Sequence, residues 1–169
     1  MSDRGERPAA VASDGAVLDS IPPHGRLYAV VVVVDPDLPR RVHLVEALTN
    51  HPDDKYDSYG VVDIDHLLAL AVEPHIVLVR AADRTELEDV LRAFRSDPRH
   101  VGTPCLVIGS ASVGSVDHDV SAADAFELGA ADWVAGDVQL PELCARIDAR
   151  ARAVIGVDRL GRRHGGAAM

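Results

Sequence analysis

Aromatic residues and positive charge are scarce in this 169-residue sequence. Only 4% of the residues are aromatic although 47% are hydrophobic, so the core has to be built from Val, Leu, Ile and Ala. The formal net charge of −10 repels the phosphate groups of nucleic acids, and the densest basic run is short: Arg159, Arg162 and Arg163. We therefore expect no nucleic acid partner.

Cysteines are also few, and long apolar runs are absent. Cys105 and Cys144 have apolar neighbours and form no CxxC pair, as expected for reduced, buried residues of a cytosolic protein. No apolar stretch approaches the roughly 20 residues of a membrane span, and the N-terminus has acids and prolines in place of a signal segment. We expect a soluble, cytoplasmic protein without a membrane partner.

Motifs of catalytic sites are missing as well. There is no GxSxG nucleophile turn, and no GxGxxG follows the first predicted strand, where Asp35 and Asp37 would repel a nucleotide phosphate. His118 lies between two aspartates, but a solvated loop explains these residues better than a metal site does. We predict no enzyme activity, no cofactor and no metal ion, although a site assembled only by the tertiary structure stays open.

Hydrophobic patterns predict strands that alternate with helices. Unbroken aliphatic runs are typical of strands buried in a parallel sheet, and we expect strands at 28–34, 56–62, 75–79, 105–108 and 131–135. Apolar residues spaced three and four apart predict helices that begin near residues 38, 63, 85, 121 and 140. For the first helix, the predicted inner stripe is Leu38, Val42, Val45 and Leu48.

This alternation predicts an α/β fold with a doubly wound parallel sheet, whose chemistry gathers at the carboxyl ends of the strands. Residues 1–25 are expected to be a disordered leader, because they mix Ala, Gly, Pro, Ser and charge without a period. The domain is predicted over residues 26–155. Residues 156–169 are interpreted as a polar tail or the start of a linker.

Three segments resemble the receiver (CheY-like) domains of bacterial response regulators. They are the acidic end of the first strand at 35–37, the approach to the third strand at 73–79, and the entry to the fifth strand at 129–134. The resemblance covers about residues 27–153 and implies a flavodoxin-like (βα)5 sheet with strand order 2-1-3-4-5. The segment 94–98 and the following strand are similar to the first receivers of receiver-receiver-GGDEF proteins, the diguanylate cyclase type.

The same resemblance implies that the phosphorylation chemistry is lost. A working receiver holds Mg²⁺ with two or three carboxylates. Here Asp35 and Asp37 remain as a residual acidic pocket, and Pro36 takes the place of the other acid. Arg80 stands where the family carries the phosphate-accepting aspartate, and a guanidinium is no nucleophile. Arg80 is predicted either to pair with one of these aspartates in place of the cation or to extend into solvent.

Further switch positions of the family differ here. Receivers carry a hydroxyl residue after the fourth strand, and Gly109 stands at that position here, followed by Ser110. They carry a lysine after the fifth strand, and Gly136 stands there. Trp133 matches the aromatic switch residue, beside a face where receivers commonly dimerise or dock partners, although a lone tryptophan also fits a core. The candidate interface is Trp133, Val138 and Leu140.

These observations predict a phosphorylation-independent pseudo-receiver. It would dimerise or dock an adaptor or signalling protein, in bacterial signalling linked by family analogy to the cell cycle or to cyclic di-GMP. One alternative is a cyclic di-GMP receptor that uses Trp133 together with Arg159, Arg162 and Arg163. Another is an atypical phospho-switch that uses Asp35, Asp37 or Asp83.

Overall fold

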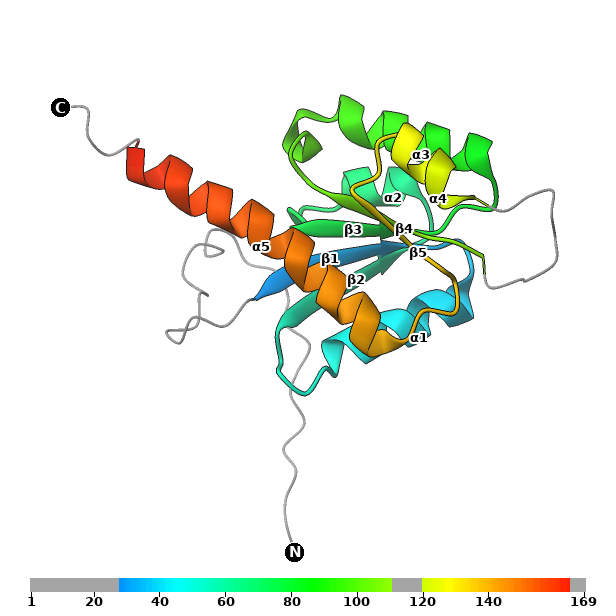
Figure 1. The fold of residues 1–169 in the computed structure, drawn as a ribbon, viewed down its shortest axis with the longest axis horizontal. Coiled ribbons are helices and arrows are strands. Elements are labelled where there is room, and N and C mark those ends of the chain that lie inside the picture. The colour runs from blue at the N-terminus through cyan, green and yellow to red at the C-terminus, as the bar shows by residue number, and fades with distance from the viewer. Residues whose placement is uncertain (1–27, 111–119, 165–169) are drawn as a thin grey trace, which may run out of the picture.

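Five parallel strands form one sheet in the order β2-β1-β3-β4-β5 (Figure 1). The strands are β1 (Ala29–Val34), β2 (Tyr56–Val61), β3 (Ile76–Val79), β4 (Cys105–Ile108) and β5 (Asp132–Val134). The computed structural model describes residues 28–110 and 120–164, with side chains up to residue 156. The predicted fold class and strand order are confirmed.

Helices cover both faces of the sheet (Figure 1). α1 (Leu38–Thr49) and α5 (Leu140–His164) lie on one face, and α2 (Ile64–Ala69), α3 (Arg84–Ser96) and α4 (Ala122–Glu127) lie on the other. A short 3-10 helix, η1 (Pro98–His100), follows α3. Four of the α-helices begin at side chains that accept a backbone N–H of the first turn: Asp37, Asp63, Asp83 and Ser121.

The core consists of two aliphatic layers, one on each side of the sheet. Successive residues of a strand point to opposite faces, so Val32 and Val34 of β1 belong to the layer under α2, α3 and α4, whereas Val31 and Val33 belong to the layer under α1 and α5. All four are buried. This double burial explains why β1 is an unbroken β-branched run without polar alternation.

The predicted inner stripe of α1 is partly wrong. Leu48 is buried and Val45 packs against the core, but Leu38 and Val42 are exposed. Because each residue turns the helix by about 100°, Val42 lies roughly 120° from Leu48, whereas Arg41 lies nearly in line with it. An arginine therefore occupies an inward position of α1 that the apolar spacing did not reveal.

α5 continues past Gly156 to His164, so the segment expected as a polar tail begins as helix. Its last turns project beyond the sheet (Figure 1). The division of the chain into leader, domain and tail stays a prediction, and residues 1–25 lie outside the described part. No described helix combines the length and the apolar character needed to cross a membrane. Cys105 and Cys144 are free and buried, as predicted.

A buried histidine makes the stability of this fold sensitive to pH. His100 is 2% exposed, its ring stacks on Phe94 with centroids 4.9 Å apart, and neither ring nitrogen has a hydrogen-bond partner among the described residues. Burial lowers the pKa of His100 below its ordinary value of 6.5, against the opposing charge of Asp97. Because only the unfolded chain takes up the proton near that value, we expect the free energy of unfolding to fall as the pH drops below about 6.5.

Urea unfolding at about pH 7.5 and about pH 5.5 measures this loss, which is expected to be smaller in His100→Phe. His43→Gln is the control, because His43 is exposed on α1. An equal pH dependence in wild type and His100→Phe would contradict the assignment to His100.

Candidate functional site

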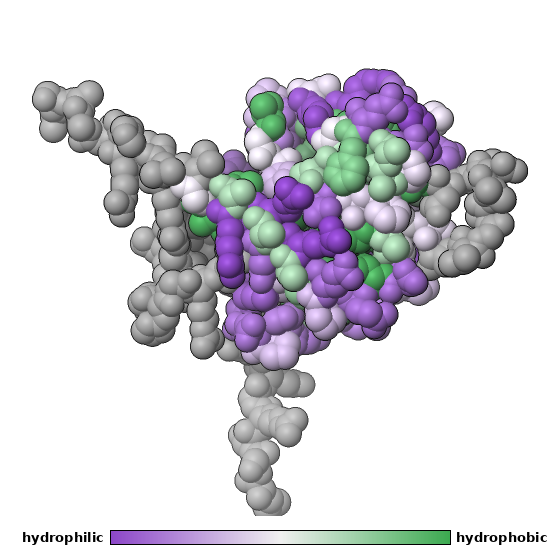
Figure 2. Space-filling view, in the orientation of Figure 1, coloured by the Kyte–Doolittle hydropathy of each residue, from purple (hydrophilic) through white to green (hydrophobic). Residues whose placement is uncertain are grey.

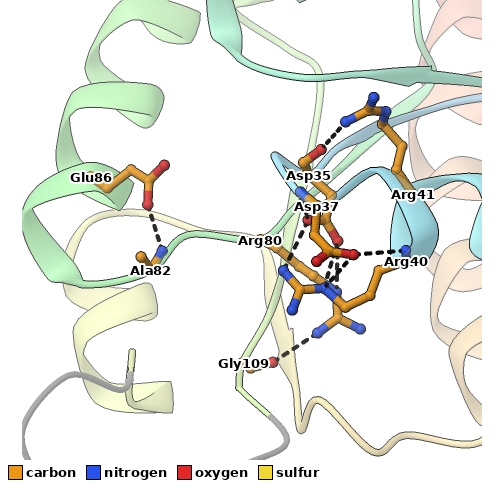
Figure 3. Close-up of polar contacts among 8 residues, drawn as sticks. All are labelled: Asp35, Asp37, Arg40, Arg41, Arg80, Ala82, Glu86 and Gly109. Atoms are coloured by element: carbon orange, nitrogen blue, oxygen red, sulfur yellow. Dashed lines mark hydrogen bonds and ion pairs between the residues drawn. The ribbon is translucent and has the colours of Figure 1, made fainter.

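One buried carboxylate meets two arginines at the carboxyl ends of β1 and β3 (Figure 3). Asp35 directly follows β1 and is only 1% exposed. Arg80 directly follows β3, and its Nε lies 3.3 Å from Asp35 Oδ2. Arg40, in the first turn of α1, donates from Nη2 to Asp35 Oδ1 at 3.2 Å and from Nε to Oδ2 at 3.3 Å. Both oxygens of the carboxylate therefore face guanidinium groups.

Arg80 links the ends of three neighbouring strands. Its backbone N–H donates to the carbonyl of Val34 at 2.9 Å, which extends the pairing of β3 with β1 by one residue. Its side chain reaches Asp35 after β1, and Nη1 donates to the carbonyl of Gly109 after β4 at 3.2 Å. The arginine side chain is 19% exposed. The guanidinium is therefore held by one hydrogen bond and one ion pair, although the geometry of the Nε–Asp35 contact is not that of a hydrogen bond. The alternative that the side chain extends into solvent is wrong.

The two aspartates of the expected acidic pocket have different surroundings. Asp35 points into the site and also accepts the backbone N–H of Asp37 at 2.9 Å. Asp37 accepts the backbone N–H of Arg40 at 2.9 Å and so caps α1. Of the two partners predicted for Arg80, its ion pair is with Asp35. The carbonyl of Asp35 accepts a further hydrogen bond from Arg41, the inward-facing arginine of α1.

Charge and burial act against each other in this site. Burial lowers the pKa of Arg80, while the charge of Asp35 raises it and that of Arg40 lowers it. The hydrogen bond to Asp35 raises the pKa of Arg40. Both arginines stay protonated at neutral pH, so they outnumber the buried carboxylate. This arrangement can hold the ends of the strands together through charge, and the guanidinium of Arg80 is itself no nucleophile.

Within residues 28–110 and 120–164 there is no group of three His, Cys, Asp or Glu side chains with an arrangement suitable for a metal ion. His118 and its flanking aspartates lie outside this part of the chain.

Gly109 and Trp133 form a second part of the site, next to the ion pair of Arg80 and Asp35. The indole of Trp133 packs across the end of β4, so that a Cβ added at Gly109 would lie 2.9 Å from Cζ2. The indole N–H donates to the carbonyl of Val120 at 3.1 Å, and the ring packs partly buried against the core. Trp133 is therefore largely a packing residue. Ser110 is exposed beside Gly109, and Gly136 lies in the loop after β5.

The face formed by α4, β5 and α5 carries an exposed ring that sequence reasoning missed. Phe126 of α4 is 51% exposed. Asp124 and Glu127 of α4 reach Arg84 of α3, and helical geometry places Phe126 on the other side of Ala125, away from α3. In a helix of six residues, no periodicity separates the buried row from the exposed one.

The remaining members of the candidate interface are less exposed. Val138 and Leu140 are partly buried and pack against the core layer under α1 and α5. In Figure 2, small hydrophobic patches are surrounded by polar residues on the side of the molecule that is in view. The side chains of Arg159, Arg162 and Arg163 lie outside the described part, so their contact with a cyclic dinucleotide stays a prediction.

Comparison with known proteins identifies the fold. No protein-family model and no curated protein matches the chain. Among solved structures, the receiver domain of a signal transduction histidine kinase from Syntrophus aciditrophicus is 14% identical with a TM-score of 0.58, covering 75% of this chain and 92% of that domain. The chemotaxis response regulator CheY4 of Vibrio cholerae is 15% identical with a TM-score of 0.56, covering 73% and 98%.

NtrX from Brucella abortus, solved in complex with ADP, is also similar. It is 20% identical with a TM-score of 0.65, and the match covers 82% of this chain but only 30% of NtrX. The chain thus has the flavodoxin-like fold of CheY-like receiver domains.

Proposed function

Starting from the receiver fold that the chain shares with these structures, we propose that it is a pseudo-receiver in bacterial signalling. In this role it binds a second copy of itself or a signalling protein without being phosphorylated. The observation that carries the proposal is the ion pair of Arg80 with the buried Asp35. By the receiver resemblance, Arg80 stands in the place of the phosphate-accepting aspartate.

A fixed guanidinium changes what this pocket does. Phosphorylation of a receiver needs a carboxylate that attacks the phosphoryl donor and a divalent cation that offsets the charge. Arg80 supplies a permanent positive charge and no nucleophile. Its contacts to Asp35 and to the Gly109 carbonyl tie the ends of β1, β3 and β4 together. These strand ends are then held in one arrangement without a phosphoryl group.

The proposed binding face consists of α4, β5 and α5. Phe126 supplies an exposed aromatic ring there, and aromatic rings are enriched among residues that dominate interface energies. The other candidate residues of this face are partly buried: Trp133 packs against the core layer under α4, and Val138 and Leu140 pack against the layer under α5. A cyclic di-GMP receptor is the second candidate, but the ring of Trp133 already packs on Gly109. A cytoplasmic location and a link to cyclic di-GMP or cell-cycle signalling belong to this proposal.

The test measures the oligomeric state and the covalent mass of the protein with and without a phosphodonor. We expect light scattering at about 0.5 M NaCl, where ionic contacts are screened, to show a dimer whose affinity is unchanged by acetyl phosphate and Mg²⁺. Intact-mass analysis of the same samples is expected to show no phosphoryl adduct. Phe126→Ser is expected to weaken the dimer at least about tenfold, because it removes an exposed apolar anchor.

Val101→Ser is the matched control, since Val101 is an exposed hydrophobic residue after η1, on a different part of the surface. It is expected to leave the dimer unchanged. A phosphoryl adduct on the wild type that disappears in Asp35→Asn or Asp83→Asn would favour the atypical phospho-switch instead. An equal loss of dimer in the Phe126 and Val101 variants would contradict the assignment of the interface to this face.

A further inference from the structure

A second surface feature lies beside the arginine site. A groove of about 580 Å³ opens between α2 and α3 at the carboxyl end of the sheet. Its walls include apolar side chains such as Val62 and Val90, and its rim is acidic: Asp63, Asp83, Glu86 and Asp89. We call this feature the α2–α3 groove.

The groove has an excess of negative charge. Arg80 also lines it, but its guanidinium already faces Asp35. Two rim carboxylates, Asp63 and Asp83, accept backbone N–H groups as helix caps. Glu86 accepts the N–H of Ala82 (Figure 3). Asp89 pairs with Arg92, and Asp63 contacts the ring of His66. No described arginine or lysine forms an ion pair with Asp83 or Glu86, so the rim keeps negative charge that favours a cationic ligand.

Apolar walls below a charged rim suit one kind of side chain. The stem of an arginine or lysine covers apolar surface while its charged head stays at the rim. A chain with a formal net charge of −10 offers few such segments, and its densest basic run is Arg159, Arg162 and Arg163. These three positions fall in the last turns of α5.

The direction of α5 decides which molecule can supply this run. α5 begins after β5 at the carboxyl end of the sheet and runs back, so its last turns project at the opposite end from the groove (Figure 1). The end of α5 therefore does not reach the groove of its own chain. We propose that the α2–α3 groove receives the arginine-bearing end of α5 from a second copy of this protein. This inference uses the α2–α3 groove and only the last turns of α5, without Phe126, and does not depend on the proposed binding face.

Such a contact is heterologous, because a groove on one copy meets a helix end on the next. Each copy in a pair keeps one free groove and one free helix end, so the contact generates rings or open chains. The ionic pairs lie at an accessible rim, and contacts of this kind are modest and weakened by salt. Weak, salt-sensitive assembly is the signature to look for.

Sedimentation equilibrium of the full chain carrying Phe126→Ser tests the contact apart from the proposed binding face. At low salt we expect the average mass to rise with concentration, and at about 0.5 M NaCl we expect a monomer. Adding Asp89→Lys, or adding Arg162→Glu with Arg163→Glu, is expected to weaken association at least about tenfold. Glu88→Lys is the matched control: it makes the same charge change on the neighbouring residue, and both Glu88 and Asp89 pair with Arg92.

A mixture of the two weakened variants gives the decisive result. The Asp89→Lys chain keeps its arginines, and the Arg162→Glu, Arg163→Glu chain keeps its acidic groove. A 1:1 mixture is therefore expected to associate at least about tenfold more strongly than either variant alone. Far-UV circular dichroism checks that both are folded. A mixture of folded chains that stays monomeric overturns the proposal, as does an equal loss with Glu88→Lys. A parent chain that is monomeric up to about 1 mM also overturns it.

Discussion

Arg80→Ala is expected to lower the free energy of unfolding by about 2 kcal/mol. The substitution leaves the carboxylate of Asp35 buried at 1% exposure with Arg40 as its remaining cation. Removing one partner of a buried ion pair costs roughly 3 to 5 kcal/mol. The expected loss is smaller here, since Arg40 stays in contact with both oxygens although its side chain is 55% exposed and screened by solvent. Urea unfolding with an unchanged denaturant slope measures the loss.

Two further variants separate charge from packing. Arg40→Ala is expected to cost below about 1 kcal/mol, because exposed ion pairs contribute little. Arg80→Met keeps most of the apolar stem but not the guanidinium, so it is expected to lose nearly as much stability as Arg80→Ala. A stable Arg80→Met would mean that the stem and not the charge holds this site. In that case the ion pair could not be what fixes the ends of the strands.

Gly109→Thr is expected to destabilise the fold by about 2 kcal/mol, within the range for overpacked cores. This change restores the hydroxyl that the receiver resemblance assigns to the position. The new Cβ would lie 2.9 Å from Cζ2 and 3.2 Å from Cε2 of Trp133. The indole is a rigid ring, and its N–H donates a hydrogen bond to the carbonyl of Val120, so the ring has to move as a whole. Unfolding in urea is followed by far-UV circular dichroism, which also serves for variants without this single tryptophan.

Gly102→Thr is the control, since no described atom lies within 4 Å of a Cβ at Gly102. It is expected to change stability by less than about 0.5 kcal/mol. In a Trp133→Leu background, the cost of Gly109→Thr is expected to shrink, because the side chain that it meets is smaller and flexible. Additive losses in the double variant would show that the two residues do not compete for the same space.

Gly109 lies where the ion pair of Arg80 and the indole of Trp133 meet. Its carbonyl accepts from Arg80, and the indole of Trp133 covers its α-carbon. A side chain at this position would therefore disturb the tryptophan, and loss of the arginine would free the carbonyl. Both losses are expected if this end of the sheet is held in one arrangement.

Features that depend on neighbours along the chain were determined by the sequence itself. The β-branched run 29–34 predicts a strand covered on both faces, because local propensity and apolar continuity are enough. Asp63 at the start of α2 and the acid-rich start of α3 were likewise readable as helix beginnings. The absence of a carboxylate at position 80 excludes an aspartyl phosphate there, whatever the fold does.

Some sequence patterns were ambiguous even within one element. In α1, the row of Leu38, Val42 and Val45 fits a period of three and four, but the face that packs is centred nearer Leu44 and Leu48. A spacing identifies a helix, while the side that faces the sheet depends on how the helix is docked. The same ambiguity hid the inward position of Arg41 and the exposure of Phe126.

The partners within the site were decided by the tertiary structure alone. The sequence left open whether Arg80 pairs with Asp35 or Asp37, and it said nothing of Arg40. Residues 35, 80 and 109 become neighbours only because β1, β3 and β4 lie side by side in a parallel sheet. Periodicity and propensity act over a few residues, whereas an ion pair depends on the distance between atoms brought together by the fold. The sequence therefore determined which charges exist, and the sheet decided which of them meet.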